Sequence, residues 1–379
     1  MKFGIVVVGY NRVDSMKRLI ASLLDADYEG DNVDLIISID NSGTDYVEEY
    51  ANTVQWPFGD KKIKTYKERM GLRKHILTCG DYVYNYDGIA VLEDDIFVSP
   101  AFYHFMKQAV AFYKDDDNVA GISLYTHLWS ENVQRPFCPE KRQYDSYFLK
   151  YAQSWGQVWM PKQWRAFRDW YESHSGEIEA DHKTPKHITR WAKTSWLKYH
   201  IKYCIDNNKY FVYPYFSYTT NYVEVGQHCK TSNKIYQVPM AYDDSREYHF
   251  PAFGAQDVPY YDGFFERQIL PETLMLDDEV SVDLYGAKEI GKERYVISTQ
   301  RLDFAVIKSY GLYLRPQEMN VLYNIPGDDI FLYDTTIGSG EKTEEFSMTR
   351  WDYDSRVFDY RYVIKVVANV FKSKILRRN

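Results

Sequence analysis

Three consecutive acidic residues, Glu93, Asp94 and Asp95, follow a short apolar run, GIAVL, that ends at Leu92. Adjacent carboxylates repel one another and resist burial, so their burial costs free energy unless a cation accompanies them. In an extended segment, residues 93 and 95 point the same way and can share one ligand. Such oxygens suit Mg²⁺ or Mn²⁺, which keep water and substrate phosphates as their other ligands. The spacing therefore favours a cation site, and the alternative is a solvated acidic turn.

Two more polar clusters follow apolar runs of the same kind. The run Lys2–Val8 leads into Tyr10 and Arg12, and DLIISI leads into Asp40. An aspartate at this position can accept hydrogen bonds from a nucleobase or ribose, or it can form an Asx turn. Three polar clusters after three apolar runs make a solvated acidic turn at residues 93–95 a weaker explanation.

Basic side chains near these clusters have two interpretations. Arg12 and Arg73 can each grip a diphosphate through a two-pronged contact, or they can form surface ion pairs. His75, two residues after Arg73, has the same two interpretations.

The elements that position these residues alternate between strands and helices over residues 1–125. Such an order predicts an α/β fold with a mostly parallel sheet and helices on both faces. In open sheets of this type ligands bind beyond the carboxyl ends of the strands, where all three clusters fall. The expected strands are 2–8, 34–39, 61–66, 88–92 and 119–124, and the expected helices are 14–24, 44–52, 69–85 and 100–113.

The remaining chain is less regular. Residues 126–250 are rich in aromatic side chains, and we expect helices near 161–173 and 187–206 and a strand near 210–213. Residues 251–345 are expected to form a strand-rich accessory region, and 346–379 a basic amphipathic end. The predicted domains are therefore 1–250, divided at residue 125 into a nucleotide half and an acceptor half, then 251–345 and 346–379.

Composition narrows the class of function. The 379 residues carry a net charge of −8, which argues against a nucleic-acid-binding domain. The 36 tyrosines are abundant, and those between residues 144 and 222 fall in the predicted acceptor half. Four scattered cysteines and the lack of a long apolar segment predict a reduced, cytoplasmic protein that does not span a membrane. A helix over 356–376 with basic and apolar faces predicts peripheral contact with an anionic membrane, and the alternatives are packing on the body or a solvated basic end.

Several sequence segments resemble GT-A glycosyltransferases, which use nucleotide sugars. VVVGYNRVDSMKRLIASLL is similar to the first strand–helix unit of family-2-like enzymes, and IISIDNSGT to the second. VLEDDIFVSPAFYHFM resembles the metal-binding segment, and GLRKHIL resembles the segment that holds the donor diphosphate. With GISLYT and SWGQVWMPKQW, the pattern is most similar to N-acetylglucosaminyltransferase I and its bacterial relatives. The resemblance covers about residues 1–245.

The resemblance implies a role for each matching residue. Asp95 would ligate the metal, Mn²⁺ or Mg²⁺, with His228 as a second contact, and Glu93 and Asp94 would hold the ribose and donor sugar. Trp155 and Gly156 would border the donor sugar and the acceptor. The catalytic base of the family has no acidic counterpart near residues 194–197, which leaves Asp181, Glu179 and Asp206 as nearby candidates, although a surface charge is the simpler interpretation of each. The residues expected to line the nucleotide are Tyr10, Arg12, Asp40, Arg73 and His75.

The predicted function is a metal-dependent hexosyl- or N-acetylhexosaminyltransferase. We expect a UDP-sugar donor and a glycan or lipid-linked acceptor, as in bacterial surface polysaccharide synthesis. One alternative is a nucleotidyltransferase acting on sugar phosphates, which would favour a basic, glycine-rich loop after the first strand, whereas GYNRVDS is poor in both. A second alternative is a non-catalytic carbohydrate-binding protein, which has no need for three adjacent acids.

Overall fold

The computed structural model describes residues 1–222, 234–243, 246–340 and 348–355, with residues 361, 364–365, 367–369 and 371 near the end. The chain divides into two compact units, Met1–Gln268 and Ile269–Asn379. The boundary lies later than the predicted residue 250, because Tyr260–Tyr261 forms strand β13 of the first unit's sheet.

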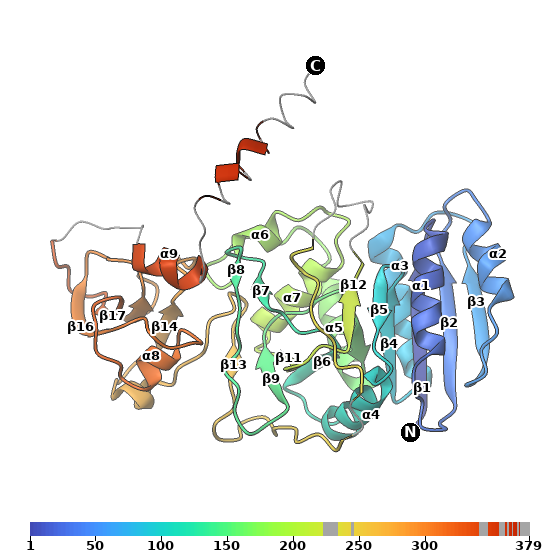
Figure 1. Cartoon of the computed structure of the whole chain (residues 1–379), viewed down its shortest axis with the longest axis horizontal. Coiled ribbons are helices and arrows are strands. Elements are labelled where there is room, and N and C mark those ends of the chain that lie inside the picture. The colour runs from blue at the N-terminus through green and yellow to red at the C-terminus, as the bar shows by residue number, and fades with distance from the viewer. Residues whose placement is uncertain are drawn as a thin grey trace. The chain divides into compact units, whose positions relative to one another are not determined.

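A nine-stranded sheet forms the first unit, in the order β13-β9-β11-β6-β10-β4-β1-β2-β3 (Figure 1). The pairs among β4, β1, β2 and β3 are parallel, as predicted, whereas β10 runs antiparallel between β4 and β6. The strands of this sheet are β1 (Phe3–Gly9), β2 (Val33–Ile39), β3 (Lys61–Thr65), β4 (Gly88–Glu93), β6 (Val119–Ser123), β9 (Ser146–Leu149), β10 (Gln157–Trp159), β11 (Tyr210–Pro214) and β13. Short pairs join β5 (Ile96–Val98) to β12 (Thr219–Asn221) and β7 (Trp129–Ser130) to β8 (Arg135–Pro136).

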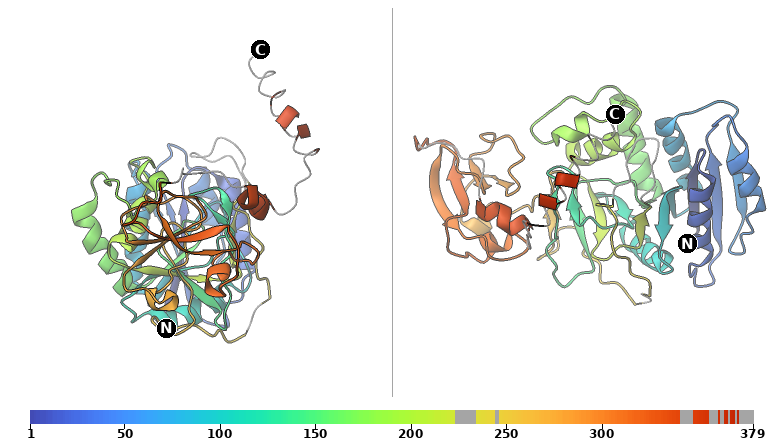
Figure 2. Two further views of the ribbon diagram at one scale, coloured as in Figure 1. Left: turned by 90° about the vertical axis from the view of Figure 1, so that its left-hand side faces the viewer. Right: turned by 45° about the horizontal axis from the view of Figure 1, so that its top comes forward.

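The central strands form because both of their faces are buried. Every residue of β1 and β2 is buried, and alternate side chains such as Ile5 and Val7 pack in one apolar core with Met16 and Leu19 of α1. Helices flank the sheet, as Figure 2 shows from two further sides. The helices of this unit are α1 (Val13–Leu24), α2 (Tyr46–Thr53), α3 (Leu72–Gly80), η1 (Asp81–Asn85), α4 (Phe102–Tyr113), α5 (Pro161–His174), α6 (Lys186–Thr189) and α7 (Leu197–Asp206).

Two predicted helices are divided in the structure. The segment 69–85 begins its helix only at Leu72, after Gly71 with a φ of 77°, and it ends in the 3₁₀ turn η1. The segment 187–206 contains the short helix α6 and the separate helix α7. The interruption ends at Trp196, the residue before α7, and the Trp196 side chain is buried.

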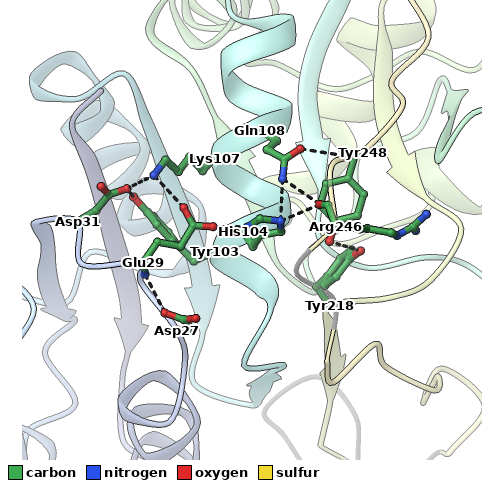
Figure 3. Close-up of polar contacts among 10 residues, drawn as sticks. All are labelled: Asp27, Glu29, Asp31, Tyr103, His104, Lys107, Gln108, Tyr218, Arg246 and Tyr248. Atoms are coloured by element: carbon green, nitrogen blue, oxygen red, sulfur yellow. Dashed lines mark hydrogen bonds and ion pairs between the residues drawn. The ribbon is translucent and has the colours of Figure 1, made fainter.

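A polar network fixes α4 at the edge where the parallel strands begin (Figure 3). Lys107 Nζ lies 2.8 Å from Glu29 Oε2 and 2.6 Å from Asp31 Oδ2, and both acids are in the loop before β2. On the other side of α4, Tyr248 donates its backbone N–H to Gln108 at 3.0 Å. The network therefore braces the edge of the sheet opposite the predicted ligand site.

The second unit contains a four-stranded sheet in the order β14-β15-β17-β16, which confirms strands in the predicted accessory region. Its elements are η2 (Pro271–Leu274), β14 (Val280–Asp283), β15 (Tyr295–Ser298), β16 (Ala305–Tyr310), α8 (Met319–Leu322), β17 (Ile330–Asp334) and α9 (Met348–Ser355). Of the predicted basic helix over 356–376, the few described positions are helical, and the rest lies outside the described residues. Within the described part of the chain, no helix is long and apolar enough to cross a membrane.

Candidate active site

The acidic triplet sits in the turn between β4 and β5, at the carboxyl end of β4. Glu93 is the last residue of β4 and lies in register with Val8 of β1. Asp94 is buried, whereas the Asp95 side chain keeps 30% of its exposure. The carbonyl of Asp95 accepts the backbone N–H of Tyr222 at 2.7 Å, which ties this turn to the end of β12. Asp95 is thus more open to a ligand than Asp94.

Arg12 neutralises part of the triplet. Its Nε donates to Asp94 Oδ2 at 3.2 Å while Nη2 contacts the other oxygen of the same carboxylate, and Nη2 lies 3.3 Å from Asp95. Although burial alone would lower the pKa of Arg12, the two carboxylates raise it above its usual value. The structure therefore places the predicted diphosphate-binding arginine on the acidic triplet itself.

The triplet remains strained electrostatically despite Arg12. Burial, and then the negative charges of Asp95 and Asp94, raise the pKa of Glu93 well above its ordinary range. Burial likewise raises the pKa of Asp94 to about 6, and Arg12 opposes the shift. A side-chain hydrogen bond from Trp196, the residue before α7, favours the charged form of Glu93. More negative charge is gathered here than one arginine can balance.

A divalent cation suits this donor set. Hard carboxylate oxygens at a partly open turn, where burial above all raises the pKa of Glu93 and Asp94, are the groups that a Mg²⁺ or Mn²⁺ ion would stabilise. No group of three or more His, Cys, Asp or Glu side chains among the described residues is arranged as a complete metal site. The arrangement therefore fits an ion held by one protein carboxylate, Asp95, with water and substrate phosphates as its other ligands.

The Asp40 carboxylate accepts hydrogen bonds from the backbone. Its Oδ1 accepts the N–H groups of Met70 at 2.7 Å and Asn41 at 2.9 Å, and its Oδ2 accepts that of Gly71 at 2.9 Å. The carboxylate thereby fixes the loop that begins α3, where Arg73 and His75 lie. The Asp40 side chain is only 4% exposed, so its three backbone contacts are the role that the structure shows directly.

The other predicted nucleotide residues are less available than expected. His75 is buried with its Nε2 at 2.8 Å from Ser38 Oγ, and burial lowers its pKa to about 4, so it is neutral. Arg73 donates to the Tyr199 hydroxyl at 2.7 Å and thus joins α3 to α7. The ring of Tyr10 lies under the guanidinium of Arg69 at 5.1 Å. The structure supports a positioning role for His75 and Arg73 more directly than contact with a diphosphate.

Trp155 and Gly156 lie just before β10, at the same edge of the sheet as the triplet. The Trp155 ring stacks on the Tyr236 ring with 5.0 Å between the ring centroids, and its centroid lies 4.8 Å from that of Tyr125. Gly156 has a φ of 104°, and a Cβ there would lie 2.9 Å from the Thr219 side chain. A glycine is needed at this point to let β12 approach the turn.

Two further predictions have different outcomes. Asp181 accepts the N–H groups of Lys183 and Thr184 and pairs with Lys202 Nζ at 2.7 Å. Burial acts to raise the pKa of Asp181, but the hydrogen bonds with Lys202 and Thr184 outweigh it and keep the pKa below its usual value. These contacts argue against Asp181 as the base, because a carboxylate with a low pKa and a lysine partner is a weak proton acceptor. His228, the predicted second metal contact, lies outside the described residues.

Sequence reasoning missed the contact that Trp196 makes with Glu93. Trp196 reaches Glu93 from the start of α7, a contact between segments far apart in the chain that no local pattern reveals.

Solved structures with partial similarity include three glycosyltransferases. Staphylococcus aureus TarS 1–349 in complex with UDP-GlcNAc has 14% identity and a TM-score of 0.38, over 62% of this chain and 62% of that one. Mannosyltransferase PcManGT from Pyrobaculum calidifontis, with GDP-Man and Mn²⁺, has 14% identity and a TM-score of 0.32, over 50% of each chain. GalNAc-T7 with UDP, GalNAc and Mn²⁺ has 12% identity and a TM-score of 0.40, over 56% of this chain and 42% of that one.

No curated protein matches this chain in sequence. Residues 4–161 match the family described as glycosyl transferase family 2, and this segment contains the first strands of the sheet, Arg12 and the acidic triplet. The match confirms, over residues 4–161, the predicted likeness to family-2-like GT-A glycosyltransferases.

Proposed function

We propose that the chain is a metal-dependent glycosyltransferase that moves a sugar from a nucleotide-diphosphate sugar to a hydroxyl of a glycan or lipid-linked acceptor. The family match over residues 4–161 is the observation that carries this proposal, because that segment holds the acidic triplet at the end of β4. The donor we favour is a UDP-sugar carrying a hexose or N-acetylhexosamine. Bacterial surface polysaccharide synthesis, at the inner face of the cytoplasmic membrane, is the proposed setting.

The chain's own residues divide the work at the donor. Asp95 presents its open carboxylate to the metal, while Arg12 balances the buried charge of Asp94 and keeps the turn rigid. Asp40 holds the loop before α3, and Trp196 orients Glu93. A bound Mg²⁺ or Mn²⁺ would supply Lewis-acid stabilisation of the leaving nucleoside diphosphate.

A thermal-shift experiment tests the donor and the metal together. UDP-glucose, UDP-galactose, UDP-N-acetylglucosamine and GDP-mannose are each added to the protein, with and without Mn²⁺. We expect at least one nucleotide sugar to raise the Tm, and to do so only with Mn²⁺ present, because a ligand that binds the folded state stabilises it. Asp95→Asn should abolish this shift. Asp14→Asn, on a side chain that is 84% exposed, is the matched control and should behave as wild type.

Two results would count against the proposal. If none of the nucleotide sugars stabilises the wild-type protein with Mn²⁺, the chain does not bind the proposed donors. If the protein instead releases pyrophosphate from UTP and a sugar 1-phosphate, it is a nucleotidyltransferase.

A further inference from the structure

Tyr222 lies directly across from Asp95 in the short ribbon formed by β5 and β12 (Figure 1). Asn221, the last residue of β12, pairs with Ile96 at the start of β5. The next pair along this antiparallel register is Tyr222 with Asp95, and the backbone N–H of Tyr222 donates to the Asp95 carbonyl at 2.7 Å. Opposed residues of an antiparallel pair project from the same face, with their Cβ atoms about 5 Å apart. The Tyr222 side chain therefore leaves the ribbon on the face that carries the Asp95 carboxylate.

Two neighbouring side chains hold the Tyr222 ring on that face. Phe97 is two residues after Asp95 in an extended strand, so the two project from the same face. The centroid of the Phe97 ring lies 6.2 Å from that of Tyr222. The guanidinium of Arg18, on α1, lies over the Tyr222 ring with its Cζ 4.5 Å from the ring centroid. The contact with Phe97 thus supports, independently of the register, the place of the ring beside Asp95.

The Tyr222 ring is open to a ligand. Tyr222 is 38% exposed, and the neighbouring Asp95 side chain is 30% exposed. The structure describes residues 144–222 throughout, and the other tyrosines of this tyrosine-rich range are buried or half-buried. Most of the tyrosines there build the protein interior, whereas Tyr222 presents an accessible ring next to the predicted metal carboxylate.

The proposed donor brings a sugar to this place. In a nucleotide-diphosphate sugar the transferred sugar is bonded directly to the diphosphate, the group that a metal at Asp95 would hold. The Tyr222 side chain starts about 5 Å from that of Asp95, so its ring and a sugar on the diphosphate share the same surroundings. The nucleoside has a different predicted place, beside Tyr10 and Asp40, which follow β1 and β2.

The chemistry of the ring favours a sugar over the charged part of the donor. The face of an aromatic ring carries partial negative charge, so it repels phosphate oxygens. A pyranose offers C–H groups that pack on such a face, while its hydroxyl groups stay at the edge of the contact. Tyrosine suits a surface of this kind, because its ring is apolar and its hydroxyl tolerates water.

We propose that Tyr222 is a sugar-binding residue of the donor site, with its ring packed against the C–H groups of the sugar that is transferred. The inference rests on the proposed function and adds to it a side chain that contacts the sugar rather than the nucleotide. Because the hydrogen bond to Asp95 comes from the backbone N–H of Tyr222, it remains when the side chain is replaced. A substitution at this position therefore tests the ring.

Isothermal titration calorimetry gives the first test. The nucleotide sugar with the largest Tm shift is compared with its nucleoside diphosphate alone, both with Mn²⁺. We expect Tyr222→Leu to raise the Kd of the nucleotide sugar roughly 3- to 10-fold and to leave that of the nucleoside diphosphate within about twofold of wild type. Tyr222→Phe keeps the ring and should bind both ligands as wild type does.

Tyr84→Leu is the matched control for this measurement. Tyr84 is 44% exposed, and the guanidinium of Arg165 lies over its ring at 5.4 Å, so its surroundings resemble those of Tyr222. It belongs to η1, which precedes β4, whereas the acidic triplet follows from the other end of that strand. Tyr84→Leu should therefore bind both ligands as wild type does.

Saturation-transfer NMR observes the contact itself. The aromatic protons of the protein are saturated, and the transfer to the sugar protons of the bound donor is compared with the transfer to its nucleoside protons. We expect Tyr222→Leu to lower the ratio of sugar to nucleoside transfer. Tyr222→Phe should restore the wild-type ratio, because a phenyl ring supplies the same contact.

The outcomes separate this inference from the proposed function. If Tyr222→Leu weakens the nucleotide sugar and the nucleoside diphosphate equally, or weakens the nucleotide sugar by less than about twofold, the inference is overturned. In both cases donor binding by the wild-type protein leaves the proposed function intact. A wild-type protein that gives no donor-induced Tm shift overturns the proposed function, and the inference with it.

Discussion

The guanidinium of Arg12 grips both oxygens of the Asp94 carboxylate, 82 residues later in the chain. This contact joins the end of β1 to the end of β4, two neighbouring strands of the sheet. Asp94 and Asp95 also differ in their environment as a result. Asp94 is buried and neutralised from within, whereas Asp95 remains open to a ligand.

Replacing Arg12 by alanine should destabilise the protein. Only 6% of the Asp94 side chain is exposed, so the variant leaves a buried carboxylate without its partner. Because Arg12 itself keeps some solvent contact, we expect a loss of about 2 kcal/mol in the free energy of unfolding, below the range for fully buried pairs. Urea denaturation measures it. Arg12→Lys keeps the charge but not the two-pronged contact, so its free energy of unfolding should lie between those of wild type and Arg12→Ala. An Arg12→Ala variant as stable as wild type would show that the ion pair contributes nothing to stability.

Asp40→Asn should loosen the loop that begins α3. The carboxylate accepts three backbone N–H groups, and an amide offers one oxygen in place of two. We expect a loss of about 1–3 kcal/mol, seen in urea denaturation, with faster hydrogen exchange at Met70 and Gly71. Asp45→Asn is the control, because Asp45 precedes α2 without a side-chain cap. Unchanged exchange at Met70 and Gly71 would contradict this role.

The sequence was sufficient to predict the strands and the polar clusters at their ends, but not the partners of the side chains in those clusters. Long apolar runs such as β1 and β2 are buried on both faces, so their position and the polar clusters at their ends could be predicted. The partners of these side chains could not be predicted, because Arg12 meets Asp94, and Trp196 meets Glu93, only through the tertiary fold. Asp181 is a candidate base only by its place in the sequence, whereas the fold brings Lys202 beside it.

Gly156→Ala should be costly although it adds a single methyl group. Gly156 has a φ of 104°, and the new Cβ would lie 2.9 Å from Thr219 Oγ1 and Cγ2. Strain of this kind costs about 1–3 kcal/mol, which a lower Tm would reveal. Gly176→Ala is the matched control, since nothing lies within 4 Å of its added Cβ. Equal Tm values for the two variants would mean that β12 moves away without cost.

His200→Phe should stabilise the protein. The imidazole is fully buried, stacks on Phe167 at 4.1 Å and lies 5.1 Å from Phe211. Neither of its ring nitrogens has a hydrogen-bond partner in the ranges that the structure describes. An aromatic ring without polar atoms avoids that desolvation, which is worth about 1 kcal/mol. Urea denaturation at pH 7.5 measures the gain, and a less stable variant would show that the ring of phenylalanine does not fit.

The same substitution should reduce sensitivity to acid. Burial lowers the pKa of His200 to about 3, from about 6.5 in the unfolded chain. Between these values the unfolded state binds a proton that the folded state excludes, so the free energy of unfolding falls as the pH drops below about 6.5. For one such group the fall from pH 7.5 to pH 5 is about 2 kcal/mol, and His200→Phe should lack it. His182→Phe, at a less buried histidine, should retain the wild-type slope. Identical slopes for wild type and His200→Phe would mean that His200 takes up its proton without unfolding.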